Sequence, residues 1–268
     1  MLSLGAGFDT TAFTLAATGC APHLFCEVDF FEVRPPPLAP NPPLTPARQT
    51  AARKAAAIAR VPALRDALGG AACVQDGPAS ITAPRYALRA ADLRLPGALA
   101  AVLQAVGMVL EAPTFILLEC VLVYMEPDQA AALLAWAAAA FPTAAVLVYD
   151  PTRPDDPFGT QMRLNLAARG CPLRGIASGA TPAAHAARLL TAGWQRSEAA
   201  DMLEVYERVI PQALRARAER CEWLDEVEEW VLIQRHYALA LGVNDAAGLL
   251  QGLTLGCGSD GDRERRNS

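Results

Sequence analysis

Short apolar runs alternate along the chain with longer stretches that have helical spacing. The runs that predict strands are 1–4, 24–28, 86–90, 115–118 and 146–149. The stretches that predict helices are 10–18, 47–68, 99–109 and 127–140. Apolar strands separated by helices are typical of a parallel sheet that is covered on both faces. We therefore expect an α/β fold.

The second half of the chain has a more helical pattern. Helices are predicted at 182–191, 202–209, 212–220 and 223–235, and a last strand at 236–241. We expect no second domain with a core of its own. Seven of the twelve residues from Pro35 to Pro46 are proline, so we expect an exposed loop without sheet pairing at 34–50. The glycine-rich, charged end, 251–268, is expected to be a disordered tail.

Composition excludes several classes of protein. The chain has 268 residues, is 53% hydrophobic and carries a net charge of −5, so it is not globally disordered and has no basic field that would attract nucleic acid. Seven cysteines without C-x-x-C spacing argue against a disulfide scaffold or a zinc ribbon. The uncharged run 130–149 is long enough to span a bilayer, but it is alanine-rich and interrupted by Phe141-Pro142. We expect a soluble, cytoplasmic monomer without a targeting signal.

A Gly-x-Gly turn follows the first predicted strand and precedes a helix. Gly5 and Gly7 would let the backbone turn sharply and approach a ligand closely. Asp9 stands near the position where a dinucleotide fingerprint has its third glycine, and it places a negative charge where pyrophosphate would bind. This disfavours an NAD-linked dehydrogenase. A cationic sulfonium cofactor without phosphates suits the turn better.

Acidic residues end or follow three further strands. Asp29 lies 24 residues after Gly5, about the distance at which an acid meets ribose hydroxyls in a βαβ nucleotide site. Asp92 follows another predicted strand, and Glu119 ends a third. Ligands of open α/β sheets bind at the carboxyl ends of the strands. The repetition predicts a nucleoside cleft, although each acid alone is more often a solvated loop residue.

Other catalytic signatures are missing from the sequence. His23, His185 and His236 have no ligand-like or triad-like neighbours, so we interpret them as surface or core-edge residues. The sequence contains no Gly-x-Ser-x-Gly elbow, no Walker loop and no His-Glu-x-x-His motif. Chemistry that needs a metal or a serine nucleophile is therefore not indicated.

The residues resemble the successive motifs of leucine carboxyl methyltransferases from residue 1 to about residue 250. The matching runs are Leu4-Gly5-Ala6-Gly7-Phe8-Asp9-Thr10-Thr11, Glu27-Val28-Asp29-Phe30, Ala91-Asp92-Leu93-Arg94, Glu119-Cys120-Val121-Leu122-Val123-Tyr124-Met125, Phe158-Gly159 with Met162, Asn165-Leu166, Gly193-Trp194, Asp201-Met202, Leu224-Asp225-Glu226 and Arg235-His236-Tyr237. The run from Glu119 to Tyr124 is the most specific. The resemblance implies a class I S-adenosylmethionine-dependent methyltransferase domain over 1–250, with a Rossmann-like, mostly parallel sheet and a helical C-terminal elaboration.

The resemblance also implies an activity and its residues. The family methylates the C-terminal leucine carboxylate of type 2A protein phosphatase catalytic subunits, with S-adenosyl-L-methionine as cofactor. Carried over by position, Gly5 would face the methionyl part of the cofactor, Asp29 the ribose, Asp92 and Leu93 the adenine, and Glu119 the methionyl ammonium group. Gly7 is also expected to bind the cofactor. Tyr124 and Arg94 are the candidates for the substrate side, because a guanidinium group binds a carboxylate bidentately.

Two departures from the family pattern keep alternatives open. The sequence begins at the first strand, without the family's upstream helices, and the proline-rich stretch interrupts what is normally a helix that resumes near Arg53-Lys54. We expect an N-terminally shortened form. One alternative is a truncated, non-catalytic module that still contacts the phosphatase. Another is a related O-methyltransferase that acts on a small carboxylic acid or on modified tRNA, which the acidic composition argues against only weakly.

Overall fold

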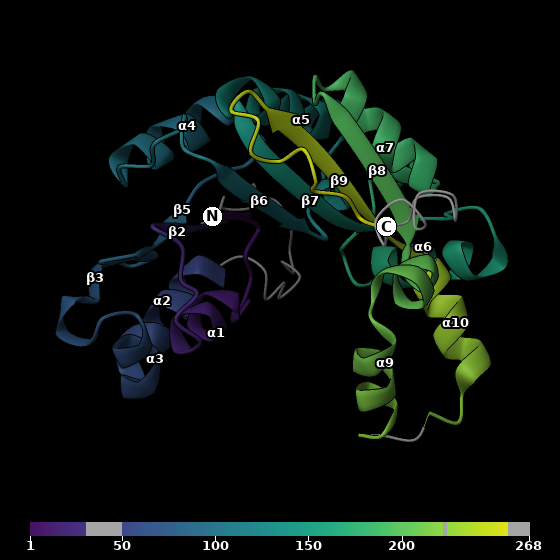
Figure 1. Ribbon diagram of the computed structural model, residues 1–268, viewed down its shortest axis with the longest axis horizontal. Coiled ribbons are helices and arrows are strands. Elements are labelled where there is room, and N and C mark those ends of the chain that lie inside the picture. The colour runs from purple at the N-terminus through teal and green to yellow at the C-terminus, as the bar shows by residue number, and fades with distance from the viewer. Residues whose placement is uncertain (31–49, 222–223, 257–268) are drawn as a thin grey trace, which may run out of the picture. The chain divides into compact units, whose positions relative to one another are not determined.

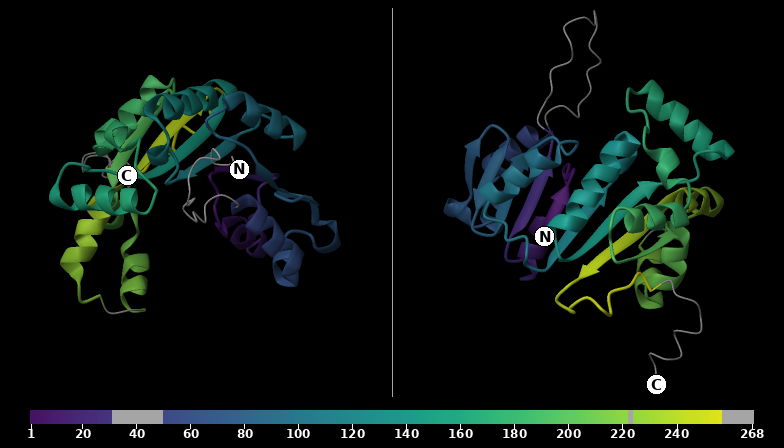
Figure 2. Two further views of the ribbon diagram at one scale, coloured as in Figure 1. Left: turned by 180° about the vertical axis from the view of Figure 1, so that it is seen from behind. Right: turned by 90° about the horizontal axis from the view of Figure 1, so that it is seen from above.

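The computed structural model describes residues 1–30, 50–221 and 224–256 (Figures 1 and 2). The chain forms two compact units, Met1–Val121 and Leu122–Ser268. The proline-rich loop expected at 34–50 lies outside the described residues except for Thr50, and so does the expected tail from residue 257 onward. A single methyltransferase domain over 1–250 stays a prediction.

The first unit is built on a sheet whose central strands are parallel. Its strand order is β3-β4-β5-β2-β1-β6. The bounds are β1 Leu2–Leu4, β2 Phe25–Asp29, β3 Val74–Gly77, β4 Ser80–Ala83, β5 Tyr86–Ala90 and β6 Thr114–Glu119. The pairs β1–β2, β1–β6 and β2–β5 are parallel, whereas β3–β4 and β4–β5 are antiparallel. The central parallel strands are buried, as their apolar sequences predict.

Several helices accompany this sheet in the first unit. They are α1 Thr11–Ala17, α2 Thr50–Arg60, α3 Pro62–Ala67, a short 3₁₀ helix Gly70–Ala72 and α4 Pro96–Ala105. Helices α1, α2 and α3 lie together (Figure 1). One face of α2 is buried through Ala51, Ala55 and Ile58, which join a core that contains Phe25 and Tyr86. The predicted helix 47–68 is divided because Pro62 has no amide hydrogen with which to continue the ladder of α2.

The second unit has antiparallel strands in the order β7-β9-β8. These strands are β7 Thr143–Pro151, β8 Arg196–Asp201 and β9 Tyr237–Asp245. Its helices are α5 Pro127–Ala140, α6 Pro157–Ala168, α7 Pro182–Thr191, α8 Met202–Glu204, α9 Gln212–Glu219 and α10 Val227–Arg235, with short 3₁₀ helices Leu122–Tyr124 and Ile176–Gly179 and a π-helix Val205–Val209. Helix α7 packs beside β8 and β9 (Figure 1).

The run 130–149 forms the rest of α5 and the first part of β7, as the break at Phe141-Pro142 predicts. Among the described residues, no helix combines the length and the apolarity that crossing a bilayer requires. The expected α/β fold is confirmed, with parallel pairs at the centre of the first unit and antiparallel pairs, β7–β9 and β8–β9, in the second.

Candidate functional site

Four adjacent strands of the first unit end at one edge of its sheet. Strand β1 lies between β2 and β6, and β5 pairs with the other side of β2. Because these strands are parallel, their carboxyl ends meet at the same edge. Gly5, Asp29, Asp92 and Glu119 follow or end these strands, so the structure brings the four sequence-predicted positions to one place. Their roles toward a cofactor stay predictions.

The turn after β1 depends on the absence of a side chain at Gly5. Both glycines are left-handed, with φ of +70° at Gly5 and +55° at Gly7. The amide of Gly5 donates to the carbonyl of Val28 at 2.7 Å. A Cβ atom on Gly5 would lie 2.5 Å from Cγ2 of Val121, whereas a Cβ on Gly7 would have no neighbour within 4 Å. Gly5 is therefore required by packing, and Gly7 leaves an open backbone surface.

The Asp29 carboxylate ties the turn to the end of β2. One oxygen, Oδ2, accepts a hydrogen bond from the amide of Gly7 at 2.6 Å, and Oδ1 accepts one from the amide of Phe30 at 2.6 Å. Asp29 is 8% exposed. Each carboxylate oxygen has a second lone pair, so the group still has acceptor capacity for the hydroxyls of a ribose.

A cavity of about 300 Å³ opens against this turn. It is lined by Ser3, Gly5, Ala6, Gly7, Phe8, Asp9, Glu119 and Cys120. Asp9 and Glu119 are carboxylates, and none of these eight residues is basic. Oδ1 of Asp9 accepts from the amide and the hydroxyl of Thr11, at 3.0 and 2.8 Å, but Oδ2 is buried and has no partner among the described residues. The cavity is therefore acidic.

These residues fit S-adenosylmethionine and do not fit a phosphate-bearing cofactor. The cofactor carries a sulfonium and an ammonium charge, which two carboxylates would stabilise, whereas phosphates would be repelled. The open backbone at Gly7 would allow a close approach. Among the sequence-predicted residues, Gly5, Gly7 and Glu119 line the cavity. Asp29 lies next to it, because its carboxylate accepts a hydrogen bond from the amide of Gly7.

Asp92 and Arg94 form a close pair after β5. Nε and a terminal nitrogen of Arg94 donate to the two oxygens of Asp92 at 2.8 and 2.6 Å. This side-chain bonding lowers the pKa of the Asp92 carboxyl below its usual range. The guanidinium also lies 5.4 Å from the centre of the Phe30 ring. Leu93 is 1% exposed, so its side chain belongs to the core and its backbone is what an adenine could meet.

Tyr124 belongs to the other unit. It ends the short helix Leu122–Tyr124 and is 44% exposed. Its proposed role on the substrate side stays a prediction.

Some features of the site were not predicted from the sequence. Cys120 lines the cavity and adopts a left-handed conformation with φ of +53°, which is uncommon for a residue with a side chain. Lys54 reaches the turn from α2, 45 residues after Asp9. His23 is exposed, but His185 and His236 are each 1% exposed. A surface position is confirmed for His23, whereas His185 and His236 are buried in the second unit, and His236 bonds to the partly exposed Asp156.

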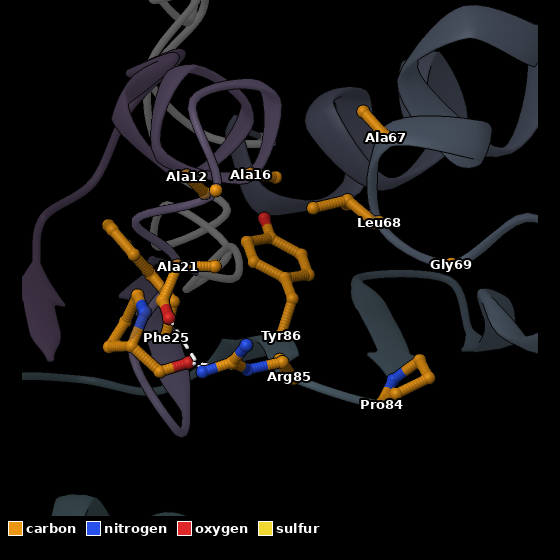
Figure 3. A pocket seen from close by; sticks show the side chains of 12 residues that line it. Ala12, Ala16, Ala21, Phe25, Ala67, Leu68, Gly69, Pro84, Arg85 and Tyr86 are labelled. Carbon is orange, nitrogen blue, oxygen red and sulfur yellow. Dashed lines mark hydrogen bonds between the residues drawn. The ribbon is translucent and has the colours of Figure 1, made fainter.

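A second cavity of the first unit, about 280 Å³, lies at the other end of the strands (Figure 3). Phe25 and Tyr86, the first residues of β2 and β5, contribute to its wall. Arg85 lies at this cavity and donates to the carbonyls of Ala21 and Pro22 at 2.6 and 2.8 Å (Figure 3). The lining is otherwise apolar and contains no acid, so this cavity offers no group for methyl transfer.

Comparison with known proteins points to one family. The family model for leucine carboxyl methyltransferases matches residues 46–138. The chain is 39% identical over 268 residues to the leucine carboxyl methyltransferase 1 homolog of Arabidopsis thaliana, which covers 100% of this chain and 75% of that protein. It is 36% identical over 239 residues to leucine carboxyl methyltransferase 1 of Bos taurus, covering 89% of this chain and 68% of that protein.

Two further similarities concern a related branch and the fold. The chain is 36% identical over 247 residues to tRNA wybutosine-synthesizing protein 4 of Homo sapiens, covering 88% of this chain and 32% of that protein. The crystal structure of a proposed methyltransferase from Thermobifida fusca matches with a TM-score of 0.53 at 14% identity, over 91% of this chain and 72% of that one. This structural similarity supports the fold.

Proposed function

Because the chain belongs to the leucine carboxyl methyltransferase family, it is a methyltransferase that uses S-adenosyl-L-methionine, and we propose that its acceptor is the C-terminal leucine carboxylate of type 2A protein phosphatase catalytic subunits. The observation that carries the proposal is the 39% identity over 268 residues to the leucine carboxyl methyltransferase 1 homolog of Arabidopsis thaliana. The acidic cavity beside the glycine turn supports it, because it suits the charges of the methyl donor.

The proposed reaction needs no proton transfer. A C-terminal carboxylate has a pKa of about 3.3 and is already ionised near neutrality. A carboxylate oxygen forms a bond to the methyl carbon while the carbon–sulfur bond breaks, and the electron pair of that bond stays on sulfur. The acceptor loses its negative charge and the donor its positive charge. The protein must therefore align the two groups and exclude water, and a general base is not required.

We assign these tasks to the residues at the sheet edge. Gly5 and Gly7 would shape the surface against the methionyl part, and Glu119 would face its ammonium group. Asp29 would accept hydrogen bonds from the ribose, and the turn at Asp92 and Leu93 would hold the adenine. Arg94 is proposed to meet the substrate carboxylate, for which it would have to share its guanidinium with Asp92. Tyr124 stays a separate candidate for the substrate side.

Methyl labelling tests the acceptor. The protein is incubated with methyl-labelled cofactor and the phosphatase catalytic subunit, either complete or lacking its last leucine. We expect label in the complete subunit and none in the shortened one, and we expect alkali to release it, as from a methyl ester. Glu119→Gln should reduce labelling. Equal labelling of both subunits would contradict the proposal.

A second acceptor class is favoured by one similarity. The 36% identity to the wybutosine-synthesizing protein makes a modified tRNA the alternative acceptor. A parallel incubation with tRNA separates the two, because label in tRNA alone would place the chain in that branch. The net charge of −5 argues against a nucleic acid acceptor. Binding of the phosphatase without label in either acceptor would favour the non-catalytic module.

A further inference from the structure

One lysine of α2 reaches the backbone of the glycine turn. The ammonium nitrogen of Lys54 lies 2.7 Å from the carbonyl oxygen of Asp9, to which it donates a hydrogen bond. The same nitrogen lies 2.5 Å from Oε2 of Glu27. Lys54 is 4% exposed. A lysine this deeply buried is rare without specific partners, so these two contacts account for its position.

Glu27 supplies the countercharge from the middle of β2. It is fully buried, and its Oε2 also accepts a hydrogen bond from the Tyr86 hydroxyl at 2.7 Å, while Oε1 has no partner among the described residues. Burial raises the pKa of the Glu27 carboxyl, and Lys54 opposes that shift. The cluster thus joins β2, β5 and α2 behind the turn.

Stability alone does not explain this buried pair. Replacing a buried ion pair by apolar side chains of similar volume is often neutral or stabilising, because the desolvation of two charges offsets their attraction. An apolar pair would, however, leave the Asp9 carbonyl without its donor. The hydrogen bond from Lys54 to the Asp9 carbonyl is therefore the contact that an apolar side chain could not reproduce.

The Asp9 carbonyl is one of several points at which the turn is held. At its start, the Gly5 amide donates to the carbonyl of Val28, and in its middle the Gly7 amide donates to Asp29. At its end, Lys54 holds Asp9, whose side chain lines the acidic cavity. The direction of the Asp9 carbonyl constrains the backbone on both sides of it, and hence the place of the Asp9 carboxylate.

We infer that Lys54 is a positioning residue for cofactor binding: it holds the glycine turn, through the Asp9 carbonyl, in the shape that receives S-adenosylmethionine, and Glu27 is present to neutralise it. The inference rests on the cofactor site at the sheet edge and is independent of the methyl acceptor. Helix α2 therefore contributes to the site indirectly, through the backbone of the glycine turn.

Two variants separate the effect of Lys54 on cofactor affinity from its effect on the stability of the fold. Lys54→Met removes the donor and leaves Glu27 without its counterion, so it should lower both stability and affinity for S-adenosylhomocysteine. Combining it with Glu27→Gln removes the unpaired acid and should recover most of the melting temperature. The double variant still has no donor for Asp9, and we expect its affinity to stay about three- to tenfold below that of the wild type, as for one lost hydrogen bond.

Tyr86→Phe is the matched control. It removes a hydrogen bond of the same cluster but leaves the contact of Lys54 with Asp9, so calorimetric affinity should stay within about twofold of the wild type. Hydrogen exchange supplies a readout without ligand. In the double variant, the amides from Gly5 to Thr11 should exchange faster, while those of β5 should be unchanged.

Two results would overturn the inference. Wild-type affinity in the double variant would show that the cluster serves stability alone. A wild-type chain that does not bind S-adenosylhomocysteine would show that the turn receives no such cofactor. Failure of the phosphatase as acceptor would change neither measurement, so the inference and the proposed substrate are tested separately.

Discussion

At Gly5, a residue without a side chain determines whether the site can form. Its left-handed backbone turns the chain out of β1, and its hydrogen atom faces the methyl group of Val121. The left-handed backbone and the lack of space for a side chain are separate requirements. Gly7 has the same kind of backbone but no neighbour within 4 Å of the place where a Cβ atom would lie. The two glycines of the motif therefore serve different purposes.

Gly5→Ala should destabilise the protein more than Gly7→Ala. Both substitutions place a side chain in the left-handed region, at a cost of about 1–2 kcal/mol. Gly5→Ala adds overpacking against Val121, worth about 1–3 kcal/mol more. Denaturant unfolding measures both, and adding Val121→Ala to Gly5→Ala should recover part of the difference. Equal effects of the two glycine substitutions would show that the contact with Val121 is unimportant.

Asp29→Ala should weaken cofactor binding and also cost stability. Loss of a charged acceptor for ribose should reduce affinity for S-adenosylhomocysteine by about ten- to hundredfold. The amides of Gly7 and Phe30 also lose their acceptor, which should lower the free energy of unfolding by about 1–3 kcal/mol. Calorimetric titration and denaturant unfolding measure the two effects.

Asp76→Ala is the control for Asp29→Ala. Asp76, in β3, accepts from the hydroxyls of Ser80 and Thr82 at 2.6 and 2.8 Å, and it lines no part of the acidic cavity. Its loss should lower stability without changing affinity. If Asp29→Ala leaves affinity unchanged while it lowers stability, Asp29 is a structural acceptor and not a ribose ligand.

The same residues show what could be predicted from the sequence. Gly5, Asp29, Asp92 and Glu119 were predictable because each ends or follows a strand, and parallel strands bring their ends together. Lys54 was not, because its contact with Asp9 depends on how α2 packs across β2. A lysine in an alanine-rich helix gives no signal of burial.

At the scale of elements, the predictions were right where a single pattern dominated. Strand β5 and helices α5 and α7 have the predicted bounds, since their apolar positions or proline starts mark them clearly. Strand β8 was missed because Arg196–Asp201 is polar and, among the described strands, pairs with β9 alone. The hairpin of β3 and β4 was missed because its strands are four residues long and partly exposed.

Helix α6 was also missed, although its start carries a recognisable cap. Oδ1 of Asp156 accepts from the amide of Gly159 at 2.8 Å, and Nε2 of the buried His236 lies 2.8 Å from Oδ2. A Cβ atom on Gly159 would lie 1.9 Å from the carbonyl oxygen of Arg153. The cap therefore connects the helix to α10 and to the loop after β7, and the sequence alone shows neither contact.

Asp156→Ala should destabilise α6 by about 1–2 kcal/mol, because it removes both the cap and the contact with His236. Thr181→Ala, which removes the cap of α7, is the matched control and should cost about 1 kcal/mol. Unfolding in denaturant compares them. An effect of Asp156→Ala no larger than that of Thr181→Ala would show that His236 contributes nothing.

The dependence of Asp156 on pH follows from its contacts. The Gly159 amide first, and then His236, lower the pKa of the Asp156 carboxyl. A lowered folded-state pKa means that the stabilisation is present above the unfolded-state pKa and is lost as the pH falls through the folded one. The difference between wild type and Asp156→Ala should therefore shrink in acid, below about pH 4.

At the scale of the whole molecule, the buried sheet should make the protein sensitive to alkali. Burial raises the pKa of the Cys26 thiol to about 12. Burial also raises the pKa of the Tyr86 hydroxyl, and the neighbouring Glu27 adds to this. Both groups keep their protons in the folded chain at a pH where the unfolded chain loses them, so stability falls as the pH rises.

We expect the free energy of unfolding to decrease from about pH 9 upward, with Cys26 contributing up to about 1.4 kcal/mol for each pH unit. Cys26→Ala should have a shallower alkaline slope than the wild type. Cys20→Ala, at an exposed thiol, is the matched control and should leave the slope unchanged. Parallel slopes for the wild type and Cys26→Ala would show that the thiol does not titrate on unfolding.

The position of β1 in its sheet has a consequence for the order in which the protein is made. Leu2 pairs with Cys26 on one side and with Ile116 on the other, so both edges of β1 are paired only after β6 has formed. Contacts so distant along the chain form late and slow folding, because a long loop must close first. While the ribosome is still synthesising α4, the glycine turn that leaves β1 lacks its contact with Val121, although Val28, Asp29 and Lys54 have already been made. Because Glu119 and Cys120 line the acidic cavity, a methyl donor present during translation should find the complete cavity once β6 has been made.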